Sequence, residues 1–378
     1  MAALTEEQTM IRDQAQAWVT EQAPVAKFRA MRDSGVEQGF QAETWQAMVD
    51  MGWTGIIVPE QYGGSDLGYL TFGIVLEETG KQLTASPLLA SALVGASALL
   101  LGGTEAQKQA WLPKVVDGSE ILTLAVDEGP RHAPNAIALQ AEKTADGFSL
   151  TGRKTMVLEG GSATALIVAT RTSGSAGDAE GITVFLLPAD TAGISRQVLK
   201  TADSRGYANI DFEDVLVGED AILGELDQGA ELLTDILDRG RAGLAAEMLG
   251  TAAQAFAMNL DYLKTRVQFG QVIGAFQALG HRAAILFSEM ELARSCVEAA
   301  LQGIDGEAPS QAQLCSLAKC KAGAFLHHMS NELSQIHGGI GMTDDFDAGF
   351  YLKRARAVEG AYGNQAFHRN RYAQLLDF

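Results

Sequence analysis

Hydrophobic and polar positions in the first part of the chain follow a helical period. Thr5 stands three residues before Gln8, a spacing that predicts a capping box at the start of the first helix. The same period predicts further helices, which cover 43–51, 69–80, 87–101 and 106–116. A turn-rich break at 58–64 separates the first two of these. This region therefore reads as all-helical.

The pattern changes near Ser119, where short apolar runs replace the helical period. These runs are rich in β-formers and lie at 121–126, 148–158, 165–170, 181–188, 208–212 and 215–217. Gly, Asp and Ser separate them, and no helical stretch lies between them. This spacing predicts an antiparallel sheet and excludes a series of βαβ units.

The helical period returns at about Ala230 and holds to the end of the chain. Four long segments are predicted, at 230–265, 276–303, 310–337 and 365–376, and their lengths suit an antiparallel bundle. The predicted fold is α+β. It has an N-terminal helical domain (1–118), a central antiparallel β-sheet domain (119–228) and a C-terminal four-helix bundle (229–378).

Charge limits the possible partners of the chain. The 378 residues include 28 Lys and Arg against 47 Asp and Glu, a net charge of −19. This excess of acid argues against nucleic acid or an anionic membrane as the main partner. A polyanionic ligand would need a local cluster of Arg and Lys. The uncharged run 82–104 is diluted by polar residues, Gly and Pro, so we expect a buried helix there and no membrane span.

The sequence predicts a reduced cytoplasmic protein. Its three cysteines form no CxxC pair, and its N-terminus has no basic region followed by an apolar one. Neither a P-loop nor a strand–GxGxxG–helix segment occurs, and HExxH and GxSxG are absent too. The six histidines show no zinc spacing, so we expect no metal site.

The first of three unusual segments is 262–277. We expect a helix to carry Arg266, break around Gly270 and Gly274, and restart at Phe276. Such a bend can bring together a guanidinium, an aromatic ring and exposed backbone N–H groups, and Arg suits a phosphate through its bidentate fork. An ordinary helix–turn–helix with a surface Arg explains the spacing equally well.

The second segment is 335–343, which carries Gly338, Gly339 and Gly341 after a long predicted helix. Glycines there allow positive φ and a close approach of the backbone to a ligand. On composition alone, a glycine C-cap with a flexible link is the more favoured explanation.

The third segment, 351–365, reads as a short basic helix, a glycine-punctuated turn and the start of another helix. A helix N-terminus can receive an anion. A solvated basic face beside a loop is an equally good interpretation of this segment.

In combination, these motifs resemble the acyl-CoA dehydrogenase family, flavoproteins that oxidise acyl-CoA thioesters to 2-enoyl-CoA. The resemblance covers essentially the whole chain. Its motifs are the opening Thr5-Glu-Glu-Gln, Pro59-Glu-x-Tyr-Gly-Gly, Arg266-x-x-Phe-Gly with Phe276-Gln, and Gln335-x-x-Gly-Gly-x-Gly. It implies the same order of helical, sheet and helical parts.

The resemblance also implies a set of FAD contacts. The matching residues are Arg266 and Phe269, which in the family often reach FAD across a subunit boundary, together with Gln335, Gly338, Gly339 and Asn364. Asp238 and Arg241 match a stretch that binds the CoA thioester portion, and the 87–101 helix would line the acyl pocket.

The catalytic base is the main departure from the family pattern. A carboxylate in a dry pocket must remove the α-proton of the thioester. The two positions that carry this Glu in the family are here Gly240 and Tyr362. Glu247 is the leading replacement, because it lies two helical turns beyond Gly240 in an apolar stretch. Glu359 is a weaker candidate. The alternatives are that Glu247 is a structural carboxylate paired within the bundle, and that a partner subunit supplies the base.

Two flavin-contacting segments of the family are also replaced, by Val126-Asp-Glu-Gly-Pro-Arg and by Met156-Val-Leu. These departures resemble a divergent branch whose short subunits pair with a subunit that carries the base. We therefore expect FAD-dependent dehydrogenation of an acyl-CoA in lipid metabolism, by this chain alone or as one subunit of a heteromer. The expected partners are electron-transfer flavoprotein or a similar acceptor, and a second subunit in a homo-oligomer or heterotetramer. A non-catalytic subunit that completes a partner's FAD site, and a flavin monooxygenase on the same scaffold, are the alternatives.

Overall fold

The computed structural model describes residues 4–178 and 180–378. The chain divides into two compact units. Unit 1 contains the chain up to Phe28, Gly73–Thr84 and Arg241–Phe378, and unit 2 contains Arg29–Phe72 and Ala85–Gly240. This division differs from the three predicted domains, whose boundaries stay a prediction.

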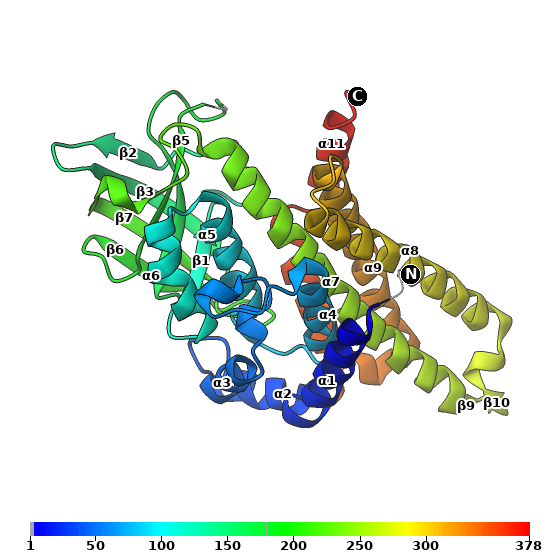
Figure 1. Ribbon diagram of the computed structural model, residues 1–378. Coiled ribbons are helices and arrows are strands. Elements are labelled where there is room, and N and C mark those ends of the chain that lie inside the picture. Colours follow the sequence, from blue (N-terminus) through cyan, green and yellow to red (C-terminus); the bar gives the residue numbers. More distant parts are fainter. Residues whose placement is uncertain (1–3, 179) are drawn as a thin grey trace. The chain divides into compact units, whose positions relative to one another are not determined.

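The described residues up to Val116 are mainly helical, as predicted (Figure 1). The α-helices are α1 (Glu6–Gln22), α2 (Val25–Ser34), α3 (Ala42–Asp50), α4 (Gly68–Lys81), α5 (Ala96–Gly102) and α6 (Glu105–Val116). The predicted capping box is confirmed, because the Thr5 hydroxyl accepts from Gln8 N and the Gln8 side chain accepts from Thr5 N, both at 3.1 Å. The short 3₁₀ turn η2 (Glu60–Tyr62) lies within the predicted break, and a second one, η1 (Trp53–Gly55), precedes it.

The predicted helix 87–101 is split into the π-helical segment η3 (Leu88–Gly95) and α5. η3 is buried along its whole length and packs against the first strand. Leu122 N donates to the Ser91 hydroxyl at 3.0 Å, and a Cβ on Gly95 would lie 2.6 Å from the Leu122 side chain. Small residues therefore let this helical segment approach the sheet closely.

The central sheet lies in unit 2. Its strands are β1 (Leu122–Ala125), β2 (Gln140–Lys143), β3 (Phe148–Val157), β4 (Ala165–Arg171), β5 (Ile182–Pro188), β6 (Ile194–Val198), β7 (Ala208–Val217) and β8 (Ile222–Leu223). The order is β6-β7-β3-β2-β4-β5-β8, and β1 pairs with β4. Most pairs are antiparallel, as predicted, but β1 runs parallel to β4 and β2 meets β4 in parallel at Gln140 and Arg171. The core of the sheet is aliphatic and aromatic, and includes Leu150, Leu166, Phe185 and Phe212.

The C-terminal part is helical again. Its helices are α7 (Gly229–Thr265), α8 (Gln277–Asp305), α9 (Gln311–His337), α10 (Ala348–Gly360) and α11 (Gln365–Gln374). Within unit 1, α9 packs against α8, α10 and α11, and Figure 1 shows α8 and α9 side by side. α7 runs across the division between the units, which falls between Gly240 and Arg241. The predicted fold class is confirmed: helices, a mostly antiparallel sheet, and helices again.

Among the described residues, no helix is both long and apolar enough to cross a membrane. The uncharged run 82–104 instead supplies η3 and α5, whose residues are almost all buried within unit 2.

Candidate functional site

The Arg266 segment forms a hairpin in unit 1. α7 ends at Thr265, and β9 (Val267–Gln268) then pairs with β10 (Gln271–Val272). Phe269 and Gly270 form the two-residue turn, with φ of 53° and 81°. Positive φ at both central positions matches the twist of a tight hairpin, which Gly allows and an aromatic residue adopts only at a cost. The predicted break at Gly270 is therefore a β-turn.

This hairpin presents its functional candidates to solvent. Arg266 is exposed, and Phe269 is 92% exposed, with its ring edge-on to Phe276 at a centroid distance of 6.1 Å. After the hairpin the chain returns tightly to α7, because a Cβ on Gly274 would lie 2.7 Å from Leu263 O. Local backbone contacts therefore fix the hairpin that carries Arg266 and Phe269.

The Gln335 segment is the C-terminal end of α9. Gly338 has φ +63° and ψ −135°, a conformation that favours glycine, and its N–H bonds the carbonyls of Gln335 and Ser334. Gln335, Gly338 and Gly339 are exposed, and a Cβ added to either glycine would meet nothing within 4 Å. The segment is therefore the glycine C-cap that composition favours, and contact of this exposed backbone with a ligand stays a prediction.

A stack of rings joins these two segments. The His337 ring stacks on Tyr262 of α7 at 4.2 Å and lies 4.6 Å from Phe346, and its Nδ1 is 2.8 Å from Leu333 O. Burial lowers the pKa of His337, with the Leu333 hydrogen bond acting in the opposite direction. Because Arg266 N bonds Tyr262 O at 2.9 Å, the ends of α7 and α9 lie at the same end of unit 1.

Asn364 is the N-cap of α11. Its Oδ1 accepts from Phe367 N at 2.9 Å, and it follows Tyr362 and Gly363, which have φ of 55° and 106°. The third predicted segment is therefore α10, a turn with positive φ, and a capped helix start.

Buried cations hold this turn from inside unit 1. Lys319 Nζ donates to Val358 O at 3.1 Å and to Gly363 O at 3.1 Å, and Arg241 Nε donates to Tyr362 O at 3.2 Å. Burial, followed by the charge of Arg241, lowers the pKa of Lys319 to about 7, while Glu359 opposes this shift. Lys319 could not be identified from the sequence, because a lone lysine in a helix belongs to no motif.

The two sets of FAD candidates lie at different levels of α9, because the Asn364 turn lies beside the N-terminal half of the helix and the other set lies at its C-terminal end. Lys319, beside the Asn364 turn, and Gln335 are 335 − 319 = 16 residues apart on one continuous helix. At 1.5 Å per residue, this is about 24 Å. Arg266, Phe269, Gln335, Gly338 and Gly339 therefore form one group, from which Asn364 is remote within this chain.

The predicted CoA-binding residues are both deeply buried, with 1% of their surface exposed. Arg241 belongs to unit 1, where its guanidinium also lies 5.4 Å from the Phe367 ring centroid. Asp238 belongs to unit 2, one helical turn earlier on α7. Their proposed contact with substrate stays a prediction.

Glu247 is half of a buried ion pair. Its Oε1 accepts from Arg354 Nε at 2.9 Å and from Arg354 Nη2 at 2.6 Å, and the two residues are 8% and 5% exposed. This two-pronged contact joins α7 to α10 inside unit 1. It is the arrangement expected for a structural carboxylate, which was the alternative to a base.

Glu359, the weaker base candidate, lies in a polar network near the surface of unit 1. Its Oε2 is 3.1 Å from His327 Nδ1, and its Oε1 accepts from Gln365 Nε2 at 3.1 Å. Arg356 Nη1 is 2.9 Å from the same histidine nitrogen. At the two family base positions, Gly240 is buried in unit 2 and Tyr362 is 8% exposed in unit 1.

In unit 2, the segment that replaces the family's flavin motif is organised by two carboxylates. Asp127 lies 3.0 Å from His132 Nδ1 and accepts from Ala133 N at 3.2 Å. Glu128 accepts from the N–H groups of Ala138 and Leu139, at 2.9 and 3.0 Å. These bonds give the loop after β1 a defined shape without the family residues.

Lys154 completes this arrangement from strand β3. Its Nζ donates to Glu128 Oε1 at 2.7 Å and to Val126 O at 3.0 Å, and the side chain is fully buried. Burial lowers its pKa to about 8, against the opposing charge of Glu128. Met156, on the same strand, is 51% exposed.

No group of three or more His, Cys, Asp or Glu side chains in the described part of the chain could hold a metal ion. His327 contacts Glu359 and Arg356, whereas His328 lies near Glu332, so the adjacent histidines have separate partners.

Two family models match this chain. The acyl-CoA dehydrogenase N-terminal domain matches residues 5–119, and the acyl-CoA dehydrogenase C-terminal domain matches residues 227–376. Together they cover more than half of the chain, and include both groups of FAD candidates.

Relatives match over nearly the whole length. A probable acyl-CoA dehydrogenase, YngJ, of Bacillus subtilis is 30% identical over 99% of this chain and 98% of its own. The structure of butyryl-CoA dehydrogenase from Megasphaera elsdenii superposes with a TM-score of 0.92, at 26% identity and full coverage of both chains. The ChsE4-ChsE5 complex from Mycobacterium tuberculosis gives 0.90, at 27% identity, over 100% of this chain and 99% of that one. The chain therefore belongs to the acyl-CoA dehydrogenase family of FAD-dependent oxidoreductases.

Proposed function

We propose that this protein oxidises an acyl-CoA thioester to the 2-enoyl-CoA, in an assembly whose FAD lies at a subunit boundary. The observation that carries the proposal is the separation of the FAD candidates, because Lys319, which donates to the turn before Asn364, is about 24 Å from Gln335 along α9. A single FAD that contacts both the Arg266 group and Asn364 is more easily bound between two subunits, each of which contributes one of the two.

The chemistry of the exposed group supports this assignment. Arg266 offers a guanidinium for a phosphate, and the backbone at Gly338 and Gly339 is exposed where a side chain would otherwise stand. Phe269 is almost fully exposed, and so large an apolar surface at a tip fits burial against a partner. Further apolar side chains on the neighbouring α8, Ile285, Phe287 and Leu292, are 57%, 51% and 52% exposed.

FAD, when bound, supplies the redox capacity of the reaction by accepting a hydride from the β carbon of the acyl group. The protein must hold the cofactor and the thioester, exclude water, and provide a base for the α-proton. Arg266, Phe269, Gln335, Gly338, Gly339 and Asn364 are the residues that we assign to holding FAD.

We further propose that a partner subunit supplies the base. The Glu247 carboxylate is bonded to Arg354 at 2.6 Å, so it would have to leave a buried ion pair before it could accept a proton. Gly240 and Tyr362 offer no carboxylate. The similarity to a chain of the ChsE4-ChsE5 complex supports an assembly of two different chains.

Turnover requires that reduced FAD be reoxidised, and we assign this step to electron-transfer flavoprotein or a similar acceptor. The subunit that completes the FAD site is a related chain or a second copy of this one, whereas the subunit that supplies the base is a related chain. Cys296, Cys315 and Cys320 form no disulfide, which supports a reducing, cytoplasmic location.

The test is to express the chain alone and together with candidate partner subunits, and to assay each sample with a dye acceptor and a panel of acyl-CoA thioesters. We expect acyl-CoA oxidation only in the complex with a partner that carries the base. Full activity of the chain alone would assign the base to this chain, with Glu247→Gln as the next variant. Oxygen consumption by reduced flavin without any response to acyl-CoA would indicate a monooxygenase. Protein without flavin in every sample would refute the proposal.

A further inference from the structure

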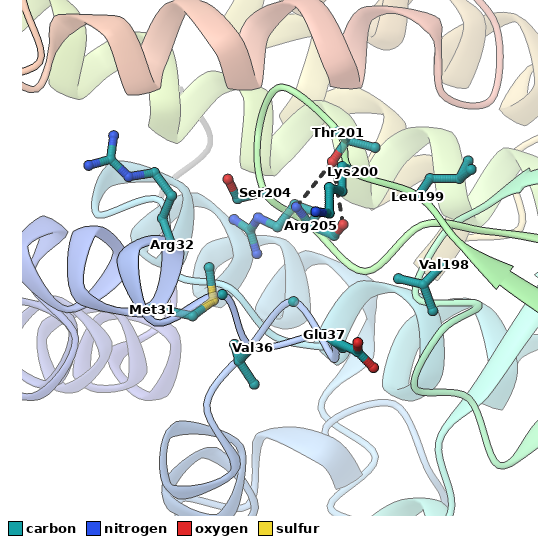
Figure 2. A pocket seen from close by; sticks show the side chains of 12 residues that line it. Met31, Arg32, Val36, Glu37, Val198, Leu199, Lys200, Thr201, Ser204 and Arg205 are labelled. Carbon is teal, nitrogen blue, oxygen red and sulfur yellow. Dashed lines mark hydrogen bonds between the residues drawn. The ribbon is translucent and has the colours of Figure 1, made fainter.

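Unit 2 contains a cavity of about 560 Å³ that none of the residues discussed above lines. Its walls are the end of α2 with the loop that follows, 31–39, and the connection between β6 and β7, 198–205 (Figure 2). This volume lies within the range of roughly 300–1,000 Å³ that is typical of small-molecule sites.

The walls of the cavity are held by the backbone. Leu199 N donates to Tyr207 O at 2.8 Å, which closes the β6–β7 connection, and Arg205 N donates to the Thr201 hydroxyl at 3.3 Å. The two walls meet at a pair of glycines, because a Cβ on Gly39 would collide with the backbone of Gly206. The shape of the cavity therefore does not depend on a ligand.

The lining of the cavity has more basic than acidic side chains, whereas the whole protein is acidic. The chain has 28 basic and 47 acidic residues, yet three basic side chains and one acidic side chain, Glu37, line the cavity. The Arg32 guanidinium is paired with Asp33 at 2.7 Å, so Arg205 and Lys200 supply the excess of positive charge. Figure 2 shows the guanidinium groups of Arg32 and Arg205 on one side of the view and the Glu37 carboxylate on the other. Lys200 is exposed and adds a further positive charge on the β6–β7 side. Such a cluster in an acidic protein attracts an anion.

The remaining walls are aliphatic. Val36 and Val198 are 38% and 42% exposed, and Met31 and Leu199 also line the cavity. No aromatic side chain is present among the described residues of the lining, so a nucleotide base would find nothing to stack on. Aliphatic surface of this kind is covered most favourably by an aliphatic chain.

We propose that this cavity binds an aliphatic anion, a molecule with one carboxylate or phosphate head group on a chain of several methylene groups. The head group lies near Lys200, and the chain lies against Val36 and Val198. This site is separate from the residues that we assign to FAD, and the proposal does not depend on the reaction proposed above.

The experiment is isothermal titration calorimetry on the flavin-loaded protein with four probes, while the visible flavin spectrum is recorded. Octanoate and octyl phosphate distinguish the two head groups, octanol lacks the charge, and inorganic phosphate lacks the chain. We expect saturable binding of at least one of the two octyl anions, at least tenfold tighter than that of octanol or of inorganic phosphate, with no change in the flavin spectrum.

Two variants locate the binding. Lys200→Gln removes a charge and is expected to weaken binding about tenfold, and Val198→Asp places a negative charge on the aliphatic wall and is expected to abolish binding. Both side chains are exposed, so folding should be retained. The matched control is Lys143→Gln, which removes the same charge from an exposed lysine on β2 of the same unit.

Three results would overturn the proposal: no saturable binding of either octyl anion, equal binding of inorganic phosphate, or affinities unchanged in both Lys200→Gln and Val198→Asp. Binding that shifts the flavin spectrum and ignores both variants would assign the anion to the substrate site instead.

Discussion

Two levels of α9 differ in how fully their polar groups are bonded within this chain. The level of Lys319 is called the closed end, and the level of Gln335 is called the open end. At the Lys319 end, a side chain that is 2% exposed donates to the carbonyls of Val358 and Gly363. At the other end, Gln335, Gly338 and Gly339 are exposed, beside a hairpin whose Phe269 is 92% exposed. Both ends carry glycines with positive φ, at Gly363 and at Gly338.

This difference in exposure suggests a structural role for the basic residues at the closed end and a binding role for the basic residue at the open end. At the closed end, Lys319 and Arg241 donate to main-chain carbonyls, so replacing either residue should lower the free energy of unfolding. The cation at the open end, Arg266, is exposed at the tip of unit 1, so its removal should be felt in ligand binding. The predictions below test this division in order of the expected effect.

Breaking the buried pair of Glu247 and Arg354 should have the largest effect. Glu247→Gln leaves an uncompensated buried guanidinium, and we expect a loss of about 3–5 kcal/mol in the free energy of unfolding, measured by urea denaturation. The double variant Glu247→Leu with Arg354→Met should recover most of this loss, because an apolar pair can replace a buried ion pair. A single variant as stable as the wild type would mean that the pair does not join α7 to α10.

Lys319→Met should cost about 2 kcal/mol, because buried carbonyls left without a donor cost roughly 1–3 kcal/mol each. Its pH dependence is a sharper test. Because burial lowers the pKa of Lys319 from 10.5 to about 7, the unfolded chain binds a proton between these values that the folded chain does not. Stability therefore rises with pH across this window.

Unfolding of wild type and Lys319→Met should be compared between pH 7 and 10. Lys154, with its pKa lowered to about 8, contributes to the rise in both proteins, so only the difference between the two curves reports Lys319. A smaller rise in the variant is expected. Parallel curves would contradict a buried, proton-poor Lys319.

At the open end, Arg266→Gln should weaken FAD binding by roughly 10- to 100-fold, the range expected when a charge-assisted hydrogen bond is lost. Its melting temperature without FAD should stay unchanged, because the side chain is exposed. Flavin titration measures the first quantity and thermal unfolding of the apoprotein the second. Arg153→Gln, another exposed arginine, in unit 2, is the control and should bind FAD normally.

Asn364→Asp should have the smallest effect on the fold, because Asp caps a helix as well as Asn does. It adds a negative charge where we expect a phosphate, so FAD affinity should fall about tenfold while stability changes by less than about 0.5 kcal/mol. If affinity is unchanged, Asn364 serves only as the cap that accepts from Phe367 N.

Local features of the fold could be predicted because neighbouring residues determine them. The capping box of Thr5 and Gln8, and the glycine end of α9 at Gly338, depend on a few consecutive positions. The hairpin at Phe269 and Gly270 is predicted only as a break, because its strands Val267–Gln268 and Gln271–Val272 are two residues long and half polar.

Long-range pairings could not be predicted from periodicity. Glu247 and Arg354 are 107 residues apart, and Lys319 and Gly363 are 44 apart, so no spacing rule connects them. The parallel pairing of β1 with β4 has the same origin, because short apolar runs indicate strands without specifying their neighbours. The stretch around Glu247 reads as a candidate base for this reason: its partner lies on another helix.

The most direct test of the account is complementation between subunits. Arg266→Gln and Asn364→Asp, each deficient in FAD alone, are co-expressed with different tags, and the mixed oligomer is purified through both tags. If the two ends of α9 serve different FAD molecules, one site in a mixed pair combines a wild-type Arg266 with a wild-type Asn364. The account predicts that about half of the sites regain wild-type flavin affinity. Flavin content no higher than the average of the two variants, in a verified mixed oligomer, would contradict a FAD site shared between subunits.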